Sequence, residues 1–223
     1  LCDRVSDSIL DAHLRQDPDS KVAVETLVTA KYMVIAGEVN SKADVDIIDV
    51  AKDAIKDIGY TDDAYGFDFK TCEIINKVHQ QSPDINQGVV DSSEHEQGAG
   101  DQGLMFGYAC NETDELMPLP ILLAHKLTAR LAQVRKGQAI EGLGPDGKSQ
   151  VTVEYVDDKP KRVDAVVIAQ QHTENIDEEE LQDAILENVI KPVCGKYFDE
   201  STKVFINGTG KFVIGGPYAD TGL

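Results

Sequence analysis

The stretch that decides the fold is KVAVETLVTAKYMVIAGEV, residues 21–39. It contains two runs rich in valine, isoleucine and other apolar residues, a composition that favours strands. We therefore predict a hairpin with strands at 21–29 and 32–39. On both sides of this hairpin the apolar residues recur with the period of a helix, which predicts helices at 4–15 and 45–58.

The same order of elements is predicted a second time, further along the chain. Strands are expected at 150–156 and 162–169, joined by a turn with the sequence DDKPK. A helix is expected at 178–190 after Asp177, a residue type that favours the N-cap position. Because the residue identities do not repeat, we interpret this as two similar α+β units, although the order strand–strand–helix is also common among unrelated domains.

The region between the two units is predicted to contain a strand at 66–80 and a helix at 118–136. Residues 82–103 form a long polar stretch between these elements, and loops of this length tend to be functional or disordered. The predicted fold class is α+β.

The composition restricts the classes of partner. The chain has 40 acidic and 21 basic residues and a formal net charge of -19, which disfavours nucleic acid because that affinity rests on Lys and Arg. Its apolar runs are too short to span a membrane, and its first residues lack the apolar segment of a secretory signal. The widely spaced cysteines indicate free thiols in a reducing cytoplasm rather than a zinc site. We therefore expect a cytoplasmic protein with neither nucleic acid nor membrane as a partner.

A glycine-rich stretch, GAGDQG at 98–103, matches the pattern G-x-G-x-x-G of dinucleotide-binding folds. In those folds the pattern follows a strand and begins a helix. Here a polar stretch precedes it, and LMFGYA, which predicts a strand or an extended segment, follows it. This context disfavours a dinucleotide site. The remaining interpretations are a cluster of turns, or a lid carrying Asp101 whose backbone approaches a ligand closely.

Two carboxylates lie in the first predicted hairpin. If Ala30 and Lys31 form the turn, residue 25 faces residue 36 across the ladder, and Glu25 and Glu38 project from the same side. Two like charges on a largely apolar face need a cation or a strong hydrogen-bond donor. The alternative is a face that is open to solvent, as in many antiparallel sheets. The sequence leaves both possibilities open.

A second candidate for chemistry is GPDGKSQ, residues 144–150, a predicted turn that delivers Lys148 to the start of a strand. Lys148 is either a phosphate ligand or a solvated lysine in a turn. The sequence GTGK at 208–211 ends like a P-loop, but Phe205 stands where the first glycine should be and no Ser or Thr follows the lysine. No nucleophile–base pair and no histidines at metal-ligand spacing are apparent. The residues by themselves therefore indicate no reaction.

Four segments are similar to those of one known family: QSPDINQG at 81–88, GAGDQGLMFGYACNETDELMPLPILLAHKL at 98–127, PDGKSQVTVEY at 145–155 and GKFVIGGPYADTGL at 210–223. They resemble S-adenosylmethionine synthetase, also called methionine adenosyltransferase. The resemblance covers nearly the whole chain, in order.

The resemblance implies a transferase that makes S-adenosylmethionine from ATP and L-methionine. The methionine sulfur attacks C5′ of the ribose and expels triphosphate, which is then hydrolysed to pyrophosphate and phosphate with the help of two Mg²⁺ and one K⁺. Sulfur is already a good nucleophile, so no activating base is required. The leaving group carries much negative charge, so cations must stabilise it.

The resemblance also implies roles for individual residues. Glu25 would help to hold K⁺, and Asp101 and Lys148 are the catalytic candidates. Residues 82–91 would belong to a loop that gates the site. The methionine-binding set would comprise Glu38, Gln81, Asp101 and Asp220, and the ATP-binding set Asp146, Lys148, Lys211, Phe212 and Asp220.

The implied architecture has three similar α+β domains that are discontinuous in sequence. Residues 1–84 and 215–223 would form a domain that contains the first unit, and 112–214 a domain that contains the second. Residues 85–111 would supply the mobile loop and a segment of the third domain. The resemblance further implies a homodimer or homotetramer with active sites shared between subunits.

The chain departs from the family pattern in several places. The family's His-Pro-Asp-Lys would lie immediately before Leu1 and its Thr-Gly-Arg-Lys immediately after Leu223, so we expect a chain truncated at both ends and inactive by itself. Lys211 stands where the family usually has arginine, which keeps the charge but loses the bidentate geometry. One rival interpretation is a non-catalytic relative that binds methionine or S-adenosylmethionine without turnover. The other, from the glycine pattern, is an NAD-dependent oxidoreductase.

Overall fold

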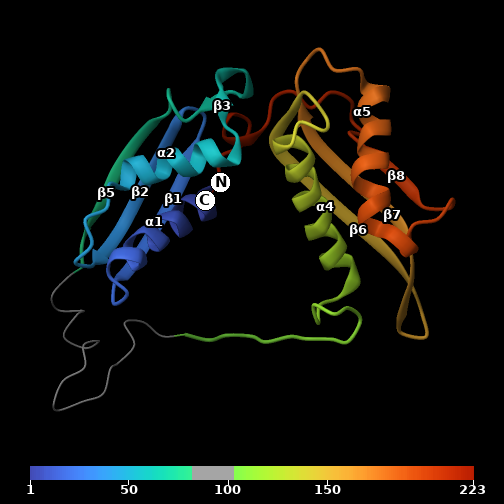
Figure 1. Cartoon of the computed structure of the whole chain (residues 1–223), viewed down its shortest axis with the longest axis horizontal. Coiled ribbons are helices and arrows are strands. Elements are labelled where there is room, and N and C mark those ends of the chain that lie inside the picture. The colour runs from blue at the N-terminus through green and yellow to red at the C-terminus, as the bar shows by residue number, and fades with distance from the viewer. Residues whose placement is uncertain (82–102) are drawn as a thin grey trace. The chain divides into compact units, whose positions relative to one another are not determined.

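The chain divides into two units in the computed structural model, which describes residues 1–81 and 103–223 (Figure 1). The first unit is Leu1–Phe106 with Pro217–Leu223, and the second is Gly107–Gly216. Each unit has its own buried apolar cluster. Both combine helices with a small sheet, which confirms the predicted α+β class. The predicted middle segment at 85–111 lies mostly outside the described residues.

The first unit places two helices on one face of a three-stranded sheet. The strand order is β1-β2-β5, with β1 and β2 antiparallel and β2 and β5 parallel. Buried residues of both helices, among them Ile9 and Ile55, share a core with the inward side chains of the sheet, such as Met33 and Ile35. The elements are α1 (Cys2–Gln16), β1 (Lys21–Thr29), β2 (Tyr32–Asn40), α2 (Ile47–Ile58), β3 (Thr61–Asp62), the 3₁₀ helix η1 (Asp63–Tyr65), β4 (Phe67–Asp68) and β5 (Glu73–Gln80).

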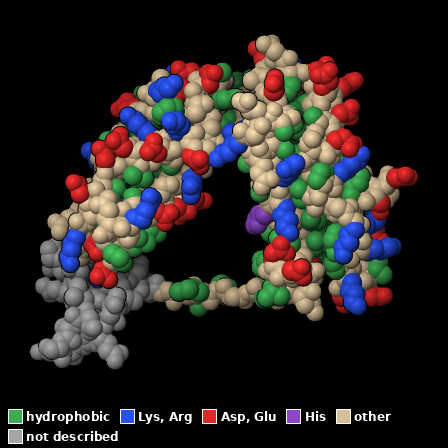
Figure 2. All heavy atoms as spheres, in the orientation of Figure 1, with side chains coloured by type: hydrophobic (Ala, Val, Ile, Leu, Met, Phe, Trp, Pro, Cys, Tyr) green, Lys and Arg blue, Asp and Glu red, His purple; other side chains and the backbone are tan. Residues whose placement is uncertain are grey.

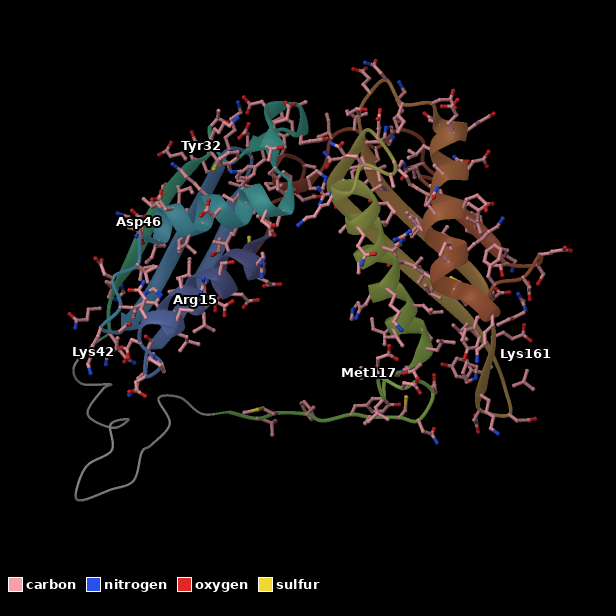
Figure 3. The ribbon with its side chains drawn as sticks, in the orientation of Figure 1. Arg15, Tyr32, Lys42, Asp46, Met117 and Lys161 are labelled. Atoms are coloured by element: carbon pink, nitrogen blue, oxygen red, sulfur yellow. The ribbon has the colours of Figure 1, made fainter. Side chains whose placement is uncertain are left out.

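Local signals explain where the elements of this unit begin and end. The Asp46 side chain, labelled in Figure 3, accepts hydrogen bonds from the backbone N–H groups of Ile48 and Asp49, and so caps α2. Gly59 ends α2 in the left-handed conformation that glycine adopts without strain. The predicted hairpin and both predicted helices are therefore confirmed.

The predicted strand at 66–80 is only partly correct. Regular pairing with β2 begins at Glu73, and β4 is a separate strand of two residues that pairs with β3. Between them the Asp68 carboxylate accepts a hydrogen bond from the backbone N–H of Lys70, and the Asp68 carbonyl accepts one from Thr71. This Asx turn competes with the strand conformation and interrupts it.

The second unit repeats the strand order and directions of the first. Its sheet has the order β6-β7-β8, with β6 and β7 antiparallel and β7 and β8 parallel, which confirms the predicted recurrence. The elements are α4 (Leu119–Lys136), β6 (Leu143–Val156), β7 (Lys159–His172), α5 (Glu178–Ile185), the π-helix η2 (Leu186–Ile190), α6 (Lys191–Cys194), the 3₁₀ helix η3 (Gly195–Tyr197) and β8 (Lys203–Ile206). The 3₁₀ helix η4 (Gly216–Tyr218) begins at the last residue of this unit and continues into the C-terminal segment of the first unit.

The helices of the second unit were predicted largely as found. The helix at 118–136 is confirmed as α4, and the Asp177 side chain caps α5 by accepting from the backbone N–H groups of Glu179 and Glu180. The helix predicted at 178–190 is interrupted, because it changes from α to π geometry at Leu186. No helix among the described residues is long and apolar enough to cross a membrane.

The second hairpin is longer than predicted. Its turn consists of Asp157 and Asp158, both at positive φ, a conformation that aspartate tolerates and that suits a two-residue hairpin turn. The predicted turn DDKPK is therefore wrong in extent, because Lys159 already pairs with Val156. On the face shown in Figure 2, acidic and basic side chains occur on both units, in keeping with the charged composition.

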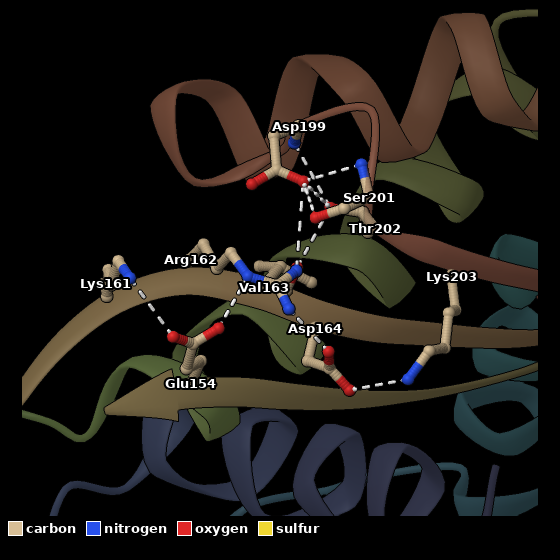
Figure 4. A network of polar contacts seen from close by, with 9 residues as sticks. All are labelled: Glu154, Lys161, Arg162, Val163, Asp164, Asp199, Ser201, Thr202 and Lys203. Atoms are coloured by element: carbon tan, nitrogen blue, oxygen red, sulfur yellow. Dashed lines mark hydrogen bonds and ion pairs between the residues drawn. The ribbon is translucent and has the colours of Figure 1, made fainter. Parts of the chain in front are cut away.

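Arg162 is the centre of a polar network near this turn (Figure 4). Its guanidinium donates to Glu154 at 2.6 Å and to Asp164 at 2.7 Å, and lies 3.8 Å from Asp199. The bond from Arg162 lowers the pKa of Asp164, and bonds from Lys161 and Arg162 lower the pKa of Glu154. The folded second unit thus favours the charged forms of these carboxylates.

We expect Arg162→Met to reduce the acid sensitivity of the second unit. A carboxylate whose pKa is lower in the folded state stabilises the fold above its unfolded pKa, and this stability disappears as the pH falls through the folded pKa. The variant should have a lower Tm near pH 7 and lose less Tm between about pH 7 and about pH 3 than the unsubstituted protein. Thermal unfolding followed by circular dichroism measures both. Lys159→Met is the control, and parallel pH curves for both variants would contradict the expectation.

Candidate functional site

The first candidate site lies where the beginning of β6 meets the end of β7. The two strands are antiparallel, so Lys148 of β6 lies opposite Ala169 and the preceding residues lie beside Gln170 and Gln171. The register is irregular between Leu143 and Gly147. Residues 144–150 were predicted as a turn, and this is incorrect because they lie within β6.

Between Leu143 and Gly147 the regular backbone pairing of β6 with β7 is interrupted, and polar side chains at the end of β7 hydrogen-bond to the backbone of β6 instead. Gln170 and Gln171 are buried, so their amides require hydrogen-bond partners. Gln170 Nε2 donates to the carbonyl oxygens of Gly144 at 2.7 Å and Asp146 at 3.2 Å. Gln171 Oε1 accepts from the backbone N–H of Asp146 at 3.2 Å. These side chains therefore determine the backbone path that leads into Lys148.

The same end of β7 holds a segment that follows β8. Gln171 Nε2 donates to the carbonyl of Val213 at 3.0 Å, and the backbone N–H of His172 donates to the carbonyl of Phe212 at 2.9 Å. Asn207 exchanges two hydrogen bonds with the backbone of Gln170, at 2.8 and 3.1 Å. Residues 211–213 have no regular secondary structure, so these contacts fix their position.

An ammonium group, a carboxylate and an aromatic ring come together here. Lys148 Nζ lies 5.3 Å from the centroid of the Phe212 ring, within the range of a cation–π contact, and 3.8 Å from Asp146 Oδ2. The same Asp146 oxygen accepts from the backbone N–H of Gly216 at 3.0 Å. The Lys148 side chain is 63% exposed, so the ammonium is accessible to an anionic ligand. Lys211, which precedes the ring in the chain, is exposed.

One residue of this site was missed by the sequence analysis. Gly215 is buried, and a Cβ built there would lie 2.8 Å from the Phe212 ring and 3.0 Å from Asp146 Oδ2. Any side chain at this position would displace the ring or the carboxylate. The two adjacent glycines of GGPY could have indicated a position where the backbone is approached closely, but only the fold shows which atoms approach it.

The second candidate site is the face of the first sheet that α1 and α2 leave open. Glu25 pairs with Ala36, and Glu38 pairs with Ala23, so both carboxylates project from one face as predicted. Both are exposed. Since solvent reaches them, neither carboxylate needs a cation in order to be accommodated in this unit, so their exposure leaves both the cation site and the open face possible.

β5 brings further polar groups beside Glu38. His79 pairs with Glu38 in the parallel ladder, and its Nε2 lies 3.5 Å from Glu38 Oε1. The backbone N–H of Gln81 donates to the carbonyl of Val39 at 3.1 Å. Gln81 Oε1 is buried and has no hydrogen-bond partner within 1–81 and 103–223. A buried acceptor without a partner is uncommon and marks a position where a ligand donor fits.

Asp220 belongs to the C-terminal segment that pairs with the edge strand of the first unit. Gly222 exchanges two backbone hydrogen bonds of 2.9 Å with Val28, and Thr221 donates to Thr29 at 2.8 Å. Asp220 is exposed. Within the described residues, no hydrogen bond connects it to Glu25 or Glu38, so the structure does not bring these three side chains together. Asp101, predicted to lie near both substrates, falls outside the described residues.

In the part of the chain that is described there is no metal-binding cluster, and three of the cysteines are buried thiols. This part of the chain contains no group of three or more His, Cys, Asp or Glu side chains that could hold a metal ion. The cysteines are free, as predicted. Burial raises the pKa of Cys194 to about 11 and raises those of Cys2 and Cys72, so these thiols are protonated at neutral pH.

Both units match models of one protein family. Residues 1–83 match the N-terminal domain of S-adenosylmethionine synthetase, and residues 96–212 match its central domain. The chain belongs to the S-adenosylmethionine synthetase family. Within the family, the Lys148–Phe212 site lies in the central-domain match, and Glu25, Glu38 and Gln81 lie in the N-terminal-domain match.

Individual members of the S-adenosylmethionine synthetase family are similar along the whole chain. The chain is 53% identical to the S-adenosylmethionine synthase of Desulfosudis oleivorans and 52% identical to that of Syntrophobacter fumaroxidans, in each case over 100% of the chain and 58% of the relative. It is also 52% identical to that of Pseudothermotoga lettingae, of which it covers 60%. The chain thus spans about 58–60% of the length of these curated relatives.

Proposed function

We propose that this chain takes part in the synthesis of S-adenosylmethionine from ATP and L-methionine. A lone pair of the methionine sulfur forms the bond to C5′ while the C5′–O bond breaks. The bonding electrons leave with triphosphate, and sulfur becomes a sulfonium. Hydrolysis of triphosphate to pyrophosphate and phosphate follows. The observation that carries the proposal is the contact of Lys148 with Phe212 in a chain that matches two domains of this family.

The chemistry of the first candidate site suits the ATP side of this reaction. The exposed ammonium of Lys148 attracts a polyphosphate and stabilises the negative charge that develops on the leaving group. The face of Phe212 offers a surface on which a base can stack. Asp146 and Lys211 complete the proposed ATP-binding set, with Lys148 as the catalytic candidate.

The first unit supplies the proposed methionine side. The orphan acceptor Gln81 Oε1 and the Glu38 carboxylate suit the α-ammonium group of the amino acid. Asp220 is proposed to bind both substrates, and Asp101 to lie beside the reacting groups. His79 would orient Glu38, since the two side chains are within ion-pair distance.

We also propose that the reaction uses two Mg²⁺ and one K⁺, with Glu25 helping to hold K⁺. The described residues supply no cluster of three metal-binding side chains, so the proposal for the ions rests on the family alone.

We propose a homodimer or homotetramer with active sites shared between subunits. The support is that, among the residues that the structure describes, no helix of either unit covers the outer face of its sheet. Apolar side chains lie there, with Tyr32 and Phe205 each 50% exposed and Val167 also exposed. Faces of this kind commonly pack against another chain.

The free thiols agree with a reducing compartment, and we propose the cytoplasm.

The proposal is tested with the purified protein at its natural length, supplied with ATP, methionine, Mg²⁺ and K⁺. We expect mass spectrometry to detect S-adenosylmethionine, pyrophosphate and phosphate, and only when both substrates are present. Binding of methionine or S-adenosylmethionine without turnover would indicate a non-catalytic relative instead. An absence of both turnover and binding would overturn the proposal.

A further inference from the structure

The buried ring of His172 lies beside the Lys148–Phe212 site, but the proposed function gives it no role. It is the last residue of β7 and only 1% exposed, so both ring nitrogens need partners inside the protein. Nε2 lies 3.0 Å from the backbone nitrogen of Phe212, and Nδ1 lies 2.9 Å from the carbonyl oxygen of Thr173.

These two partners determine where the proton is. The backbone N–H of Phe212 can only donate, so Nε2 must accept and carries no hydrogen. The carbonyl of Thr173 can only accept, so Nδ1 must carry the hydrogen. Only the neutral ring with the proton on Nδ1 satisfies both contacts. A ring protonated on both nitrogens would place two donors against each other at Phe212.

His172 hydrogen-bonds to both backbone groups of Phe212. The backbone N–H of His172 donates to the Phe212 carbonyl, while its ring accepts from the Phe212 N–H. Both backbone groups of Phe212 are thus held by one residue, within a segment that has no regular structure of its own. Gln171 secures the next carbonyl, that of Val213, and links it to Asp146.

We propose that His172, in its neutral form protonated on Nδ1, is a positioning residue that holds the Phe212 ring against Lys148. It touches no substrate and acts through the backbone of Phe212. The inference depends on the proposed function at one point, which is the assignment of Phe212 to the nucleotide.

The test compares His172→Leu with His172→Gln in the protein at its natural length. Leucine fills a similar volume but cannot accept from the Phe212 N–H, whereas the glutamine Oε1 can take the place of Nε2. Hydrogen exchange measures the protection of the Phe212 amide. Calorimetry measures the affinities for adenylyl imidodiphosphate, which resembles ATP but resists hydrolysis, and for methionine.

In the leucine variant we expect about tenfold faster exchange of the Phe212 amide and about tenfold weaker binding of the ATP analogue, which corresponds to about 1.4 kcal/mol, the scale of one unsatisfied buried donor. Methionine affinity should stay unchanged. The glutamine variant should resemble the unsubstituted protein in all three measurements. A role in packing alone predicts instead that both variants lose stability together without a selective loss of nucleotide affinity, and that result would overturn the proposal.

Two further outcomes are decisive. If the unsubstituted protein binds no ATP analogue, the proposed function fails, whereas the exchange comparison still decides whether His172 holds Phe212. If the leucine variant does not fold, the ¹⁵N resonances of the His172 ring in the unsubstituted protein decide. A neutral ring with its proton on Nδ1 is expected, and a ring protonated on Nε2 would overturn the proposal.

Discussion

Gly37→Ala is expected to lower the free energy of unfolding of the first unit by about 2–5 kcal/mol, because it combines a backbone clash with a strained backbone conformation. Gly37 lies in β2 opposite Val24, with φ at +143°, a region that is essentially restricted to glycine. A Cβ built there would lie 2.0 Å from the carbonyl oxygen of Ala23. The clash is with backbone, so β1 and β2 would have to separate.

Denaturation in urea, followed by circular dichroism, measures this loss. Gly208→Ala is the matched control, because a Cβ at that position meets no atom within 4 Å and its φ is not in the left-handed region. The control should change stability by no more than about 0.5 kcal/mol. Equal midpoints for the two variants would mean that β2 accommodates a side chain at this position. Stability is the first readout, but Glu38 follows Gly37 directly, so the same substitution should also disturb the Glu38–His79 pair.

Local features of the sequence predicted most of the elements. The turn at Ala30 and Lys31 determines the register of the first hairpin, and alternation then places Glu25 and Glu38 on one face. Asp177 is a helix cap that is recognisable within a few residues of the helix it begins. In each case the interacting residues are near one another in the chain, which is why the pattern is visible in the sequence.

Features that depend on distant residues could not be predicted. The irregular start of β6 forms because Gln170 and Gln171 replace the ladder bonds, and this explains why residues 144–150 were wrongly assigned to a turn. His79 comes beside Glu38 only because β5 adds to the sheet in parallel after α2. For the candidate site, family resemblance identified Lys148 and Phe212, but their contact through the end of β7 required the fold.

Lys148→Met is expected to lower kcat for S-adenosylmethionine synthesis by about 10²- to 10³-fold, the typical effect of removing one group that stabilises charge in a transition state. The ammonium is exposed beside Phe212. Under the proposed function it would stabilise the negative charge that develops on the triphosphate. Lys148→Arg should give an intermediate rate, since the charge remains but the geometry of its donors changes. Stability should change little because the side chain is largely in solvent.

The sheet that carries Lys148 also offers a closely matched control. Lys203 of β8 has a side chain that is likewise 63% exposed, and it lies 3.3 Å from Asp164, much as Lys148 lies 3.8 Å from Asp146. Lys203→Met therefore removes the same charge from a similar environment without removing a group that faces the Phe212 ring. Steady-state rates for both variants, measured in the protein at its natural length, separate a local role from a general effect of charge. If the two substitutions lower kcat equally, Lys148 stabilises no charge on the leaving group, and the arrangement of Asp146, Lys148 and Phe212 is not the ATP site.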